Sequence, residues 1–216
     1  MTELEFIKSV LDDMAIFVRS KYAMRDGMRV STKREANDLL TEVDLAVQEE
    51  IVARIREAFP DDAIFAEENG LHELPADRDG RTWLIDPIDG TQNFVRGLFP
   101  AFGISLGFAV EGKPVAGGVA VPGKGELFLA EKGGGAFRNG ERIVVSDVGA
   151  VGSARAEIDF SGPWDREEIL QRFSPLMIAG GLVTRLDGSP IHVFDGGRGV
   201  LASNGLLHDA LKGVIV

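Results

Sequence analysis

The sequence predicts a single α/β domain. Three observations support this prediction. Two stretches with apolar residues at helical spacing come first, short buried strands that end in carboxylates follow, and a glycine-rich run of strands and turns comes after them. A chain of 216 residues is long enough to bury one sizeable core and does not demand a second domain. Apolar residues make up 44% and charged residues 26%, as in an ordinary globular protein.

The two predicted helices lie near the N-terminus. The first begins with a capping box of Thr2 and Glu5 and is expected to stop at Gly27. Residues 27–40 are polar and basic and are expected to form a loop. The second helix is expected over residues 41–59, where valine and isoleucine recur every three or four residues before a proline.

Strands dominate the rest of the prediction. Residues 63–66 and 82–85 form short apolar runs that each end at an acidic residue, at the edge where sites in layered α/β folds usually lie. An antiparallel meander is expected over residues 102–145, because apolar runs alternate there with glycine-rich turns. A last strand over residues 199–202 leads to a short helix that ends near Lys212.

Composition excludes several classes of protein. The net charge of −11 disfavours nucleic-acid binding, and it means that carboxylates can hold an anionic substrate only with metal cations between them. The absence of cysteine excludes a cysteine-nucleophile phosphatase, a cysteine zinc site and disulfides. His72, His192 and His208 are too scattered to suggest a zinc site. No signal peptide or membrane span is recognisable, so a soluble, cytoplasmic protein is expected.

The segment that begins at Asp86 carries the strongest chemical signal. Pro87 favours an extended conformation at Asp86, so Asp86 is expected to end a strand and Asp89 to follow after a turn. The two carboxylates and the Ile88 carbonyl can then converge. An oxygen-only donor set of this kind suits Mg²⁺.

Gly90 and Thr91 follow where a further helix is expected to begin. Backbone N–H groups at a helix start bind phosphate, and the Thr91 hydroxyl is expected to cap that helix or to orient a water molecule. The structural alternative for the whole segment is an Asx-type turn with a threonine cap, because turns rich in Asp, Pro and Gly are common.

Glu67 and Glu68 add a second pair of acids. Adjacent residues on a strand point to opposite faces, so only one of them can join a given metal site directly. Glu67 is the candidate ligand, with Glu68 in the surrounding layer. For two adjacent acids taken alone, a solvated loop start is the better interpretation.

Together these segments resemble the inositol-monophosphatase-like family of Mg-dependent, lithium-sensitive phosphatases. Glu-Glu followed by Asp-Pro-Ile-Asp-Gly-Thr and Asn-Phe matches the signature of that family. Four segments carry the rest of the resemblance, which spans residues 1–147 and 178–216: Asn37–Asp44, Ala179–Thr184, Asp187-Gly188 and Ala202–Asn204.

The resemblance implies a layered αβαβα fold, of the sugar-phosphatase kind, and Mg²⁺-dependent hydrolysis of a phosphate monoester by two bridging metals. It implies that Glu67 and Thr91 activate the attacking water and that Asp44 supports Thr91. It implies metal ligation by Glu67, Asp86, the Ile88 carbonyl and Asp89. The implied substrate-binding residues are Glu67, Ile88, Asp89, Gly90 and Thr91. A small phosphorylated metabolite as substrate and a homodimer, with no nucleic-acid or membrane partner, are further expectations.

One family element is missing from its expected place. The family has a later metal-ligating aspartate in a Trp-Asp motif, shortly before its Ala-Gly-Gly segment. Here Trp164-Asp165 is followed by bulky charged residues and stands too far from Gly180. Two roles for Asp165 stay open: an altered version of the family ligand, or the N-cap of a helix over residues 166–173, which is the preferred interpretation. We therefore predict that some tens of residues are absent between Met177 and Ile178, so that part of the second half is missing.

Two rival functions and several substrates stay open. Haloacid-dehalogenase-like phosphatases use an aspartate nucleophile in Asp-x-Asp-x-Thr, and the spacing from Asp86 differs from this motif by one residue. A degenerate, non-catalytic member would bind phosphate or metal without turnover. Within the family, inositol monophosphate is the first expectation, and fructose bisphosphate, histidinol phosphate and adenosine bisphosphates are the alternatives.

Overall fold

The computed structural model describes residues 1–24, 27–32, 39–68, 80–97, 100–150, 153, 182–185, 200–203 and 206–210. They belong to two compact units, Met1–Ile143 and Val144–Val216, which are described separately. No described helix is long and apolar enough to cross a membrane. Trp164-Asp165, the helix expected over residues 166–173 and the gap predicted after Met177 lie outside the described residues.

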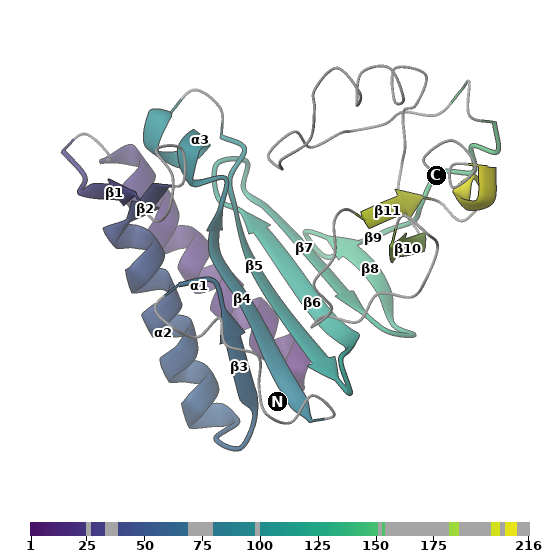
Figure 1. The fold of residues 1–216 in the computed structure, drawn as a ribbon, viewed down its shortest axis with the longest axis horizontal. Helices are drawn as coiled ribbons and strands as arrows, with labels where there is room; N and C mark the ends of the chain where they lie inside the picture. The colour runs from purple at the N-terminus through teal and green to yellow at the C-terminus, as the bar shows by residue number, and fades with distance from the viewer. Residues whose placement is uncertain are drawn as a thin grey trace. The chain divides into compact units, whose positions relative to one another are not determined.

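A seven-stranded sheet forms the centre of the first unit (Figure 1). Its strands follow the order of the chain, and only the β3–β4 pair is parallel. The antiparallel meander predicted over residues 102–145 is confirmed as strands β5 to β9. The strands are β3 (Ala63–Ala66), β4 (Arg81–Asp89), β5 (Gly103–Val110), β6 (Lys113–Val121), β7 (Glu126–Glu131), β8 (Gly135–Arg138) and β9 (Glu141–Ile143).

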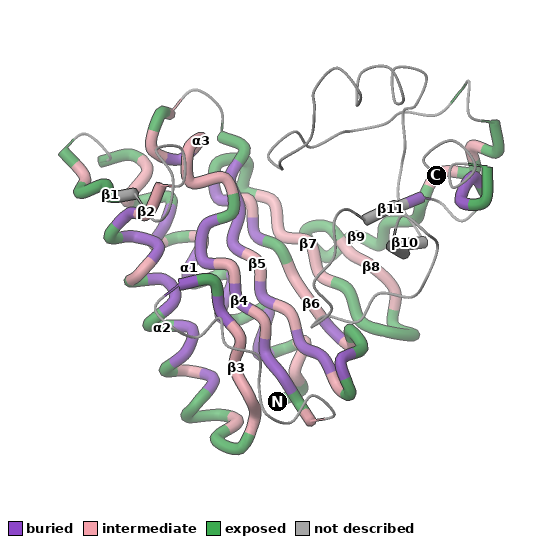
Figure 2. Tube along the Cα trace, in the orientation of Figure 1, coloured by how far each residue is buried: buried purple, intermediate pink, exposed green. Residues whose placement is uncertain are grey.

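Helices α1 (Glu3–Ala23) and α2 (Glu42–Ala58) lie side by side on this sheet, α1 against β5 to β7 and α2 against β4 (Figure 1). Both predicted helices are confirmed. The capping box of Thr2 and Glu5 is present, but α1 ends before the expected stop at Gly27. Figure 2 shows the buried residues gathered along α1, α2 and the central strands, where the core lies.

Close contact between α1 and the sheet depends on a glycine in β6. A Cβ atom placed on Gly118 would lie 2.7 Å from a Leu11 methyl group and 2.9 Å from an Ile7 methyl group. Real Cβ atoms essentially never approach so closely, so only glycine lets these two fully buried side chains lie directly on the strand. The fit holds α1 flat against the sheet.

The predicted loop over residues 27–40 is wrong in part. Strands β1 (Val30–Thr32) and β2 (Leu39–Thr41) pair antiparallel within it and lead directly into α2. The many charged and polar residues hid these short strands, because a three-residue strand shows too little alternation to be recognised. The pairing matters for the site, since β2 delivers Thr41 to the start of α2.

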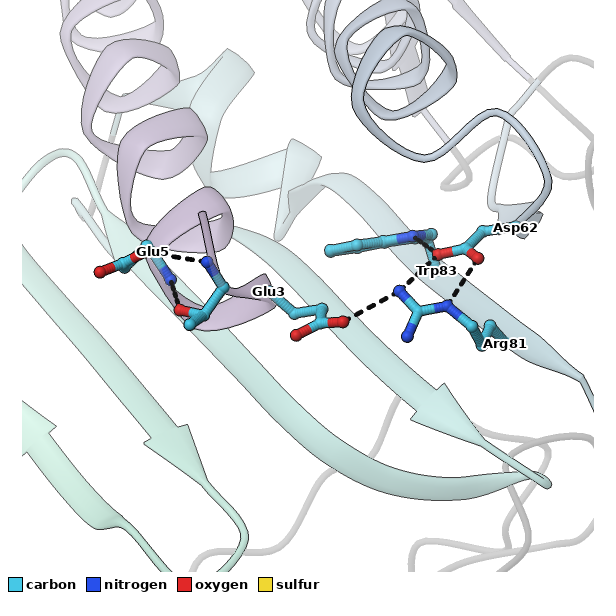
Figure 3. Close-up of polar contacts among 6 residues, drawn as sticks. Glu3, Glu5, Asp62, Arg81 and Trp83 are labelled. Carbon is cyan, nitrogen blue, oxygen red and sulfur yellow. Dashed lines mark hydrogen bonds and ion pairs between the residues drawn. The ribbon is translucent and has the colours of Figure 1, made fainter.

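A polar cluster ties the start of β4 to α1 and to the turn that follows α2 (Figure 3). Arg81 Nε donates to Asp62 Oδ1 at 2.7 Å and its Nη2 to Glu3 Oε1 at 2.9 Å. The indole N–H of fully buried Trp83 donates to Asp62 Oδ2 at 2.9 Å. Asp62 therefore accepts hydrogen bonds from the buried Trp83 indole and from the surface cation Arg81. These bonds anchor the start of β4, and Asp86 lies toward the other end of that strand.

The second unit contains an antiparallel pair, β10 (Leu182–Arg185) with β11 (Val200–Ser203). The last predicted strand is therefore confirmed, shifted by one residue. Residues 208–210 are helical, where a terminal helix was expected. Buried Ser203 Oγ lies 2.9 Å from His208 Nδ1, so the side chain of this buried histidine has a hydrogen-bond partner.

Candidate active site

The start of α2 holds a buried carboxylate, Asp44, which is 1% exposed. Its Oδ2 accepts from the Thr41 backbone N–H at 2.9 Å and from the Thr41 hydroxyl, which also caps the helix. Its Oδ1 accepts from the Thr91 hydroxyl at 3.2 Å. Burial raises the pKa of the Asp44 carboxyl above its ordinary value, because desolvation outweighs the hydrogen bonds from Thr41 and Thr91, which act to lower it.

Thr91 joins this carboxylate to the carboxyl end of β4. Its hydroxyl lies 2.9 Å from the Ile88 carbonyl and 3.2 Å from Asp44 Oδ1. A hydroxyl has one proton, so it donates to one acceptor at a time, and its oxygen keeps lone pairs for another donor. The expectation that Thr91 caps a helix is wrong. Helix α3 (Thr91–Arg96) begins after Gly90, and no side chain caps it.

Gly90 has a conformation and surroundings that only glycine fits. Its φ is +80°, in the left-handed region, and a Cβ atom there would lie 2.9 Å from the Ala101 carbonyl oxygen. The tight turn from β4 into α3 brings the Thr91 hydroxyl to 2.9 Å from the Ile88 carbonyl oxygen. Gly90 and Thr91 stand at the start of α3, where backbone N–H groups are predicted to hold phosphate.

Glu67 directly follows β3, and Asp86 lies on the neighbouring parallel strand β4, toward the same carboxyl end. Ala66 pairs with Ile85, and the Glu67 N–H donates to the Ile85 carbonyl at 3.1 Å, so each acid directly follows a paired residue. The Glu67 side chain is exposed, whereas Asp86 is half-buried with its Oδ1 fully covered. Glu68 is buried at 4% exposure, so the two adjacent glutamates differ in environment as expected for strand neighbours.

The course of the chain from Asp86 to Asp89 differs from the prediction. Instead of ending at Asp86, β4 continues through Pro87 to an exposed Asp89, with an irregularity in its pairing to β5 between the two aspartates. The Asx-type turn is therefore wrong. Proline is tolerated here because the interrupted ladder does not need its missing N–H.

The described residues contain no group of three or more His, Cys, Asp and Glu side chains arranged to hold a metal. The proposed ligand set of Glu67, Asp86, the Ile88 carbonyl and Asp89 therefore stays a prediction. Its chemistry nevertheless fits Mg²⁺, because all four donors are hard oxygens and two of them, Glu67 and Asp86, directly follow the last residues paired between β3 and β4.

One buried polar residue beside this edge, Gln48 on α2, was not predicted from the sequence. It is 3% exposed, and its side-chain amide exchanges two hydrogen bonds with the backbone of Glu68. The available signal was its spacing, because Gln48 comes four residues after Asp44 and so lies on the same face of the helix.

Comparison with known proteins gives a consistent result. The model of the inositol monophosphatase family matches residues 3–171. The chain is 36% identical to a fructose-1,6-bisphosphatase/inositol-1-monophosphatase of Thermotoga maritima, over 86% of each chain. It is 41% identical to a histidinol-phosphatase of Chlorobaculum parvum over 59% of this chain, but spans only 47% of that protein.

Solved structures agree on the fold. The IMPase of Thermotoga maritima superposes with a TM-score of 0.81 at 31% identity, covering 100% of this chain and 97% of that one. An IMPase/NADP phosphatase described as complexed with Mg²⁺ and phosphate gives a TM-score of 0.78 at 22% identity, covering 99% and 96% of the two chains. The mixed α/β fold expected from the sequence is thereby confirmed.

The alignment with the Thermotoga relative is longer than this chain. It has 227 positions but includes 86% of 216 residues, about 186, so about 40 positions hold no residue of this chain. Where these positions fall is a prediction, as is the single domain over residues 1–216. The family model, the identity to the Thermotoga relative and the shared fold agree, and the chain belongs to the inositol monophosphatase family.

Proposed function

We propose that this phosphatase hydrolyses a small phosphate monoester in a Mg²⁺-dependent reaction, with inositol monophosphate as the first candidate substrate. One observation carries the proposal. The Thr91 hydroxyl lies within hydrogen-bonding distance of two acceptors, Asp44 Oδ1 and the Ile88 carbonyl, and adjoins the segment of β4 that contains Asp86 and Asp89. Asp44 and Thr91, which we call the proton-accepting dyad, therefore lie beside a set of hard oxygen donors.

Each residue has a definite task in this proposal. Glu67, Asp86, the Ile88 carbonyl and Asp89 hold Mg²⁺, which when bound supplies positive charge for the phosphate and makes a water more acidic. Glu67 and Thr91 orient the attacking water.

The proton of that water reaches Thr91, whose own hydroxyl proton is accepted by Asp44 Oδ1. Backbone N–H groups of Gly90 and Thr91 hold the phosphate.

The substrate is proposed by analogy with named relatives. The relatives include a fructose-1,6-bisphosphatase/inositol-1-monophosphatase, a histidinol-phosphatase and human inositol monophosphatase 1. Fructose bisphosphate and histidinol phosphate are therefore the alternatives, and adenosine bisphosphates complete the panel. Inhibition by lithium, a homodimer and a cytoplasmic location are proposed on the same basis.

A binding-only role is the second candidate function, favoured by the roughly 40 aligned positions that have no counterpart here. A chain without the later family ligand would retain phosphate or metal binding but no turnover. The two functions differ in a single observable, which is the release of phosphate.

The test is phosphate release from inositol 1-phosphate, fructose 1,6-bisphosphate, histidinol phosphate and an adenosine bisphosphate, with a Mg²⁺ titration and the variant Asp86→Asn. We expect Mg²⁺-dependent release by the natural chain and none by Asp86→Asn, because the amide loses the ligand charge. Undiminished turnover in the variant would remove Asp86 from the site. A folded chain that binds Mn²⁺ but releases no phosphate from any substrate would support the binding-only function.

A further inference from the structure

The hydrogen-bond ladder between β3 and β4 ends at Glu67. In this parallel pair the Ile85 carbonyl accepts from the Glu67 N–H at 3.1 Å. Parallel ladders continue through every second residue, so the next donor on β4 would be residue 87. Residue 87 is proline, which has no N–H. The sheet therefore cannot hold the chain beyond Glu67 in the usual way.

At the next residue, Glu68, the side chain of Gln48 on α2 supplies the backbone hydrogen bonds. Its Nε2 donates to the Glu68 carbonyl at 2.6 Å, and its Oε1 accepts from the Glu68 N–H at 2.9 Å. A carboxamide has the donor and acceptor of a peptide group, so Gln48 acts as a one-residue strand partner. Both residues are at least 96% buried, with exposures of 3% for Gln48 and 4% for Glu68, so water does not compete for these bonds.

The same helix also reaches the other half of the site. Asp44 accepts from the Thr91 hydroxyl one helical turn before Gln48, and residues four apart lie on one face of a helix. Helix α2 thus contacts the backbone beside Glu67 through Gln48 and the hydroxyl of Thr91 through Asp44. A rigid element that touches both groups keeps their separation constant.

We propose that Gln48 is a positioning residue that holds Glu67 in place for metal binding by clamping the backbone of Glu68. The inference rests on the proposed function, because it takes Glu67 as a metal ligand. Loss of a residue that orients a ligand typically weakens metal affinity by about 10- to 100-fold. We expect a loss of this size when the clamp is removed.

The test compares two variants. Gln48→Met keeps the length of the side chain but removes both hydrogen bonds to Glu68, and Gln48→Asn keeps the amide on a side chain that is one methylene shorter. Val52→Ala is the matched control, because it removes buried volume from the same helix without touching Glu68. Glu67→Gln is the reference for loss of the ligand itself. Mn²⁺ affinity is measured by paramagnetic resonance, and amide exchange at Glu68 by NMR in metal-free protein.

We expect both Gln48 variants to bind Mn²⁺ about 10- to 100-fold more weakly and to exchange the Glu68 amide faster, while Val52→Ala loses only thermal stability. Natural Mn²⁺ affinity in a folded Gln48→Met or Gln48→Asn protein would overturn the positioning role, provided Glu67→Gln is impaired. If Glu67→Gln binds Mn²⁺ as well as the natural chain, the ligand assignment in the proposed function fails instead, and the positioning role fails with it.

Discussion

Replacing Asp44 with asparagine tests the proton-accepting dyad most directly. The asparagine oxygen can take the place of Oδ2 and keep both hydrogen bonds from Thr41. Its NH₂ group then faces Thr91, where the natural carboxylate accepts. Thr91 must now receive a hydrogen bond and donate its own proton to the Ile88 carbonyl. The packing is retained, but the hydrogen bond between the two side chains is reversed.

The structure indicates a small change in stability. Bonds to the carboxylate, about 1.5–3 kcal/mol each, become neutral bonds of about 1 kcal/mol, which destabilises the fold. Removing a buried charge stabilises it by a similar amount. We therefore expect the free energy of unfolding at neutral pH to change by less than about 2 kcal/mol.

The pH dependence of this difference has a definite sign. Burial raises the pKa of Asp44, so the native state binds its proton more tightly than the unfolded chain does. That stabilisation is complete below the ordinary value of 3.8 and is lost as the pH rises through the raised pKa. The melting temperature of Asp44→Asn relative to the natural chain should therefore increase from acid to neutral pH.

Turnover should respond far more strongly than stability. A positioned acid or base contributes about 10²- to 10⁴-fold, so kcat for the best substrate of the panel should fall by that factor in Asp44→Asn. Thr91→Ser, which retains the hydroxyl, should keep most of the activity. Phosphate release and thermal melts across pH provide both readouts. A kcat within threefold of the natural value in Asp44→Asn would refute the dyad and leave Asp44 as a helix cap alone.

Two further predictions concern the scaffold. Asp62→Ala should lower the free energy of unfolding by about 1–3 kcal/mol, because it removes the acceptor of the buried Trp83 indole and of Arg81; urea denaturation measures this, and an unchanged midpoint would contradict the role of the cluster. Gly90→Ala should impair turnover as well as stability, since its methyl group would strike the Ala101 carbonyl at a φ of +80°; melts and phosphate release test it, and natural values for both would show that the turn tolerates a side chain.

Local chemistry explains the elements that were correctly predicted. The capping box at Thr2 and the helical spacing of apolar residues determine α1 and α2 without reference to distant residues. The strand over residues 63–66 was recognisable for a similar reason, as a short apolar run. Strand β4 was predicted too short, because its continuation through Pro87 depends on an irregular ladder with β5 that only the folded sheet reveals.

The family of phosphatases could be identified from the sequence, because Glu67-Glu68 and the segment Asp86–Thr91 are short runs of characteristic residue types. Which residues contact these runs depends on the fold. Asp44 meets Thr91 across 47 residues, and Gln48 meets Glu68 across 20. These contacts depend on how α2 packs against β4, which is set by burial of the shared core and not by any local pattern.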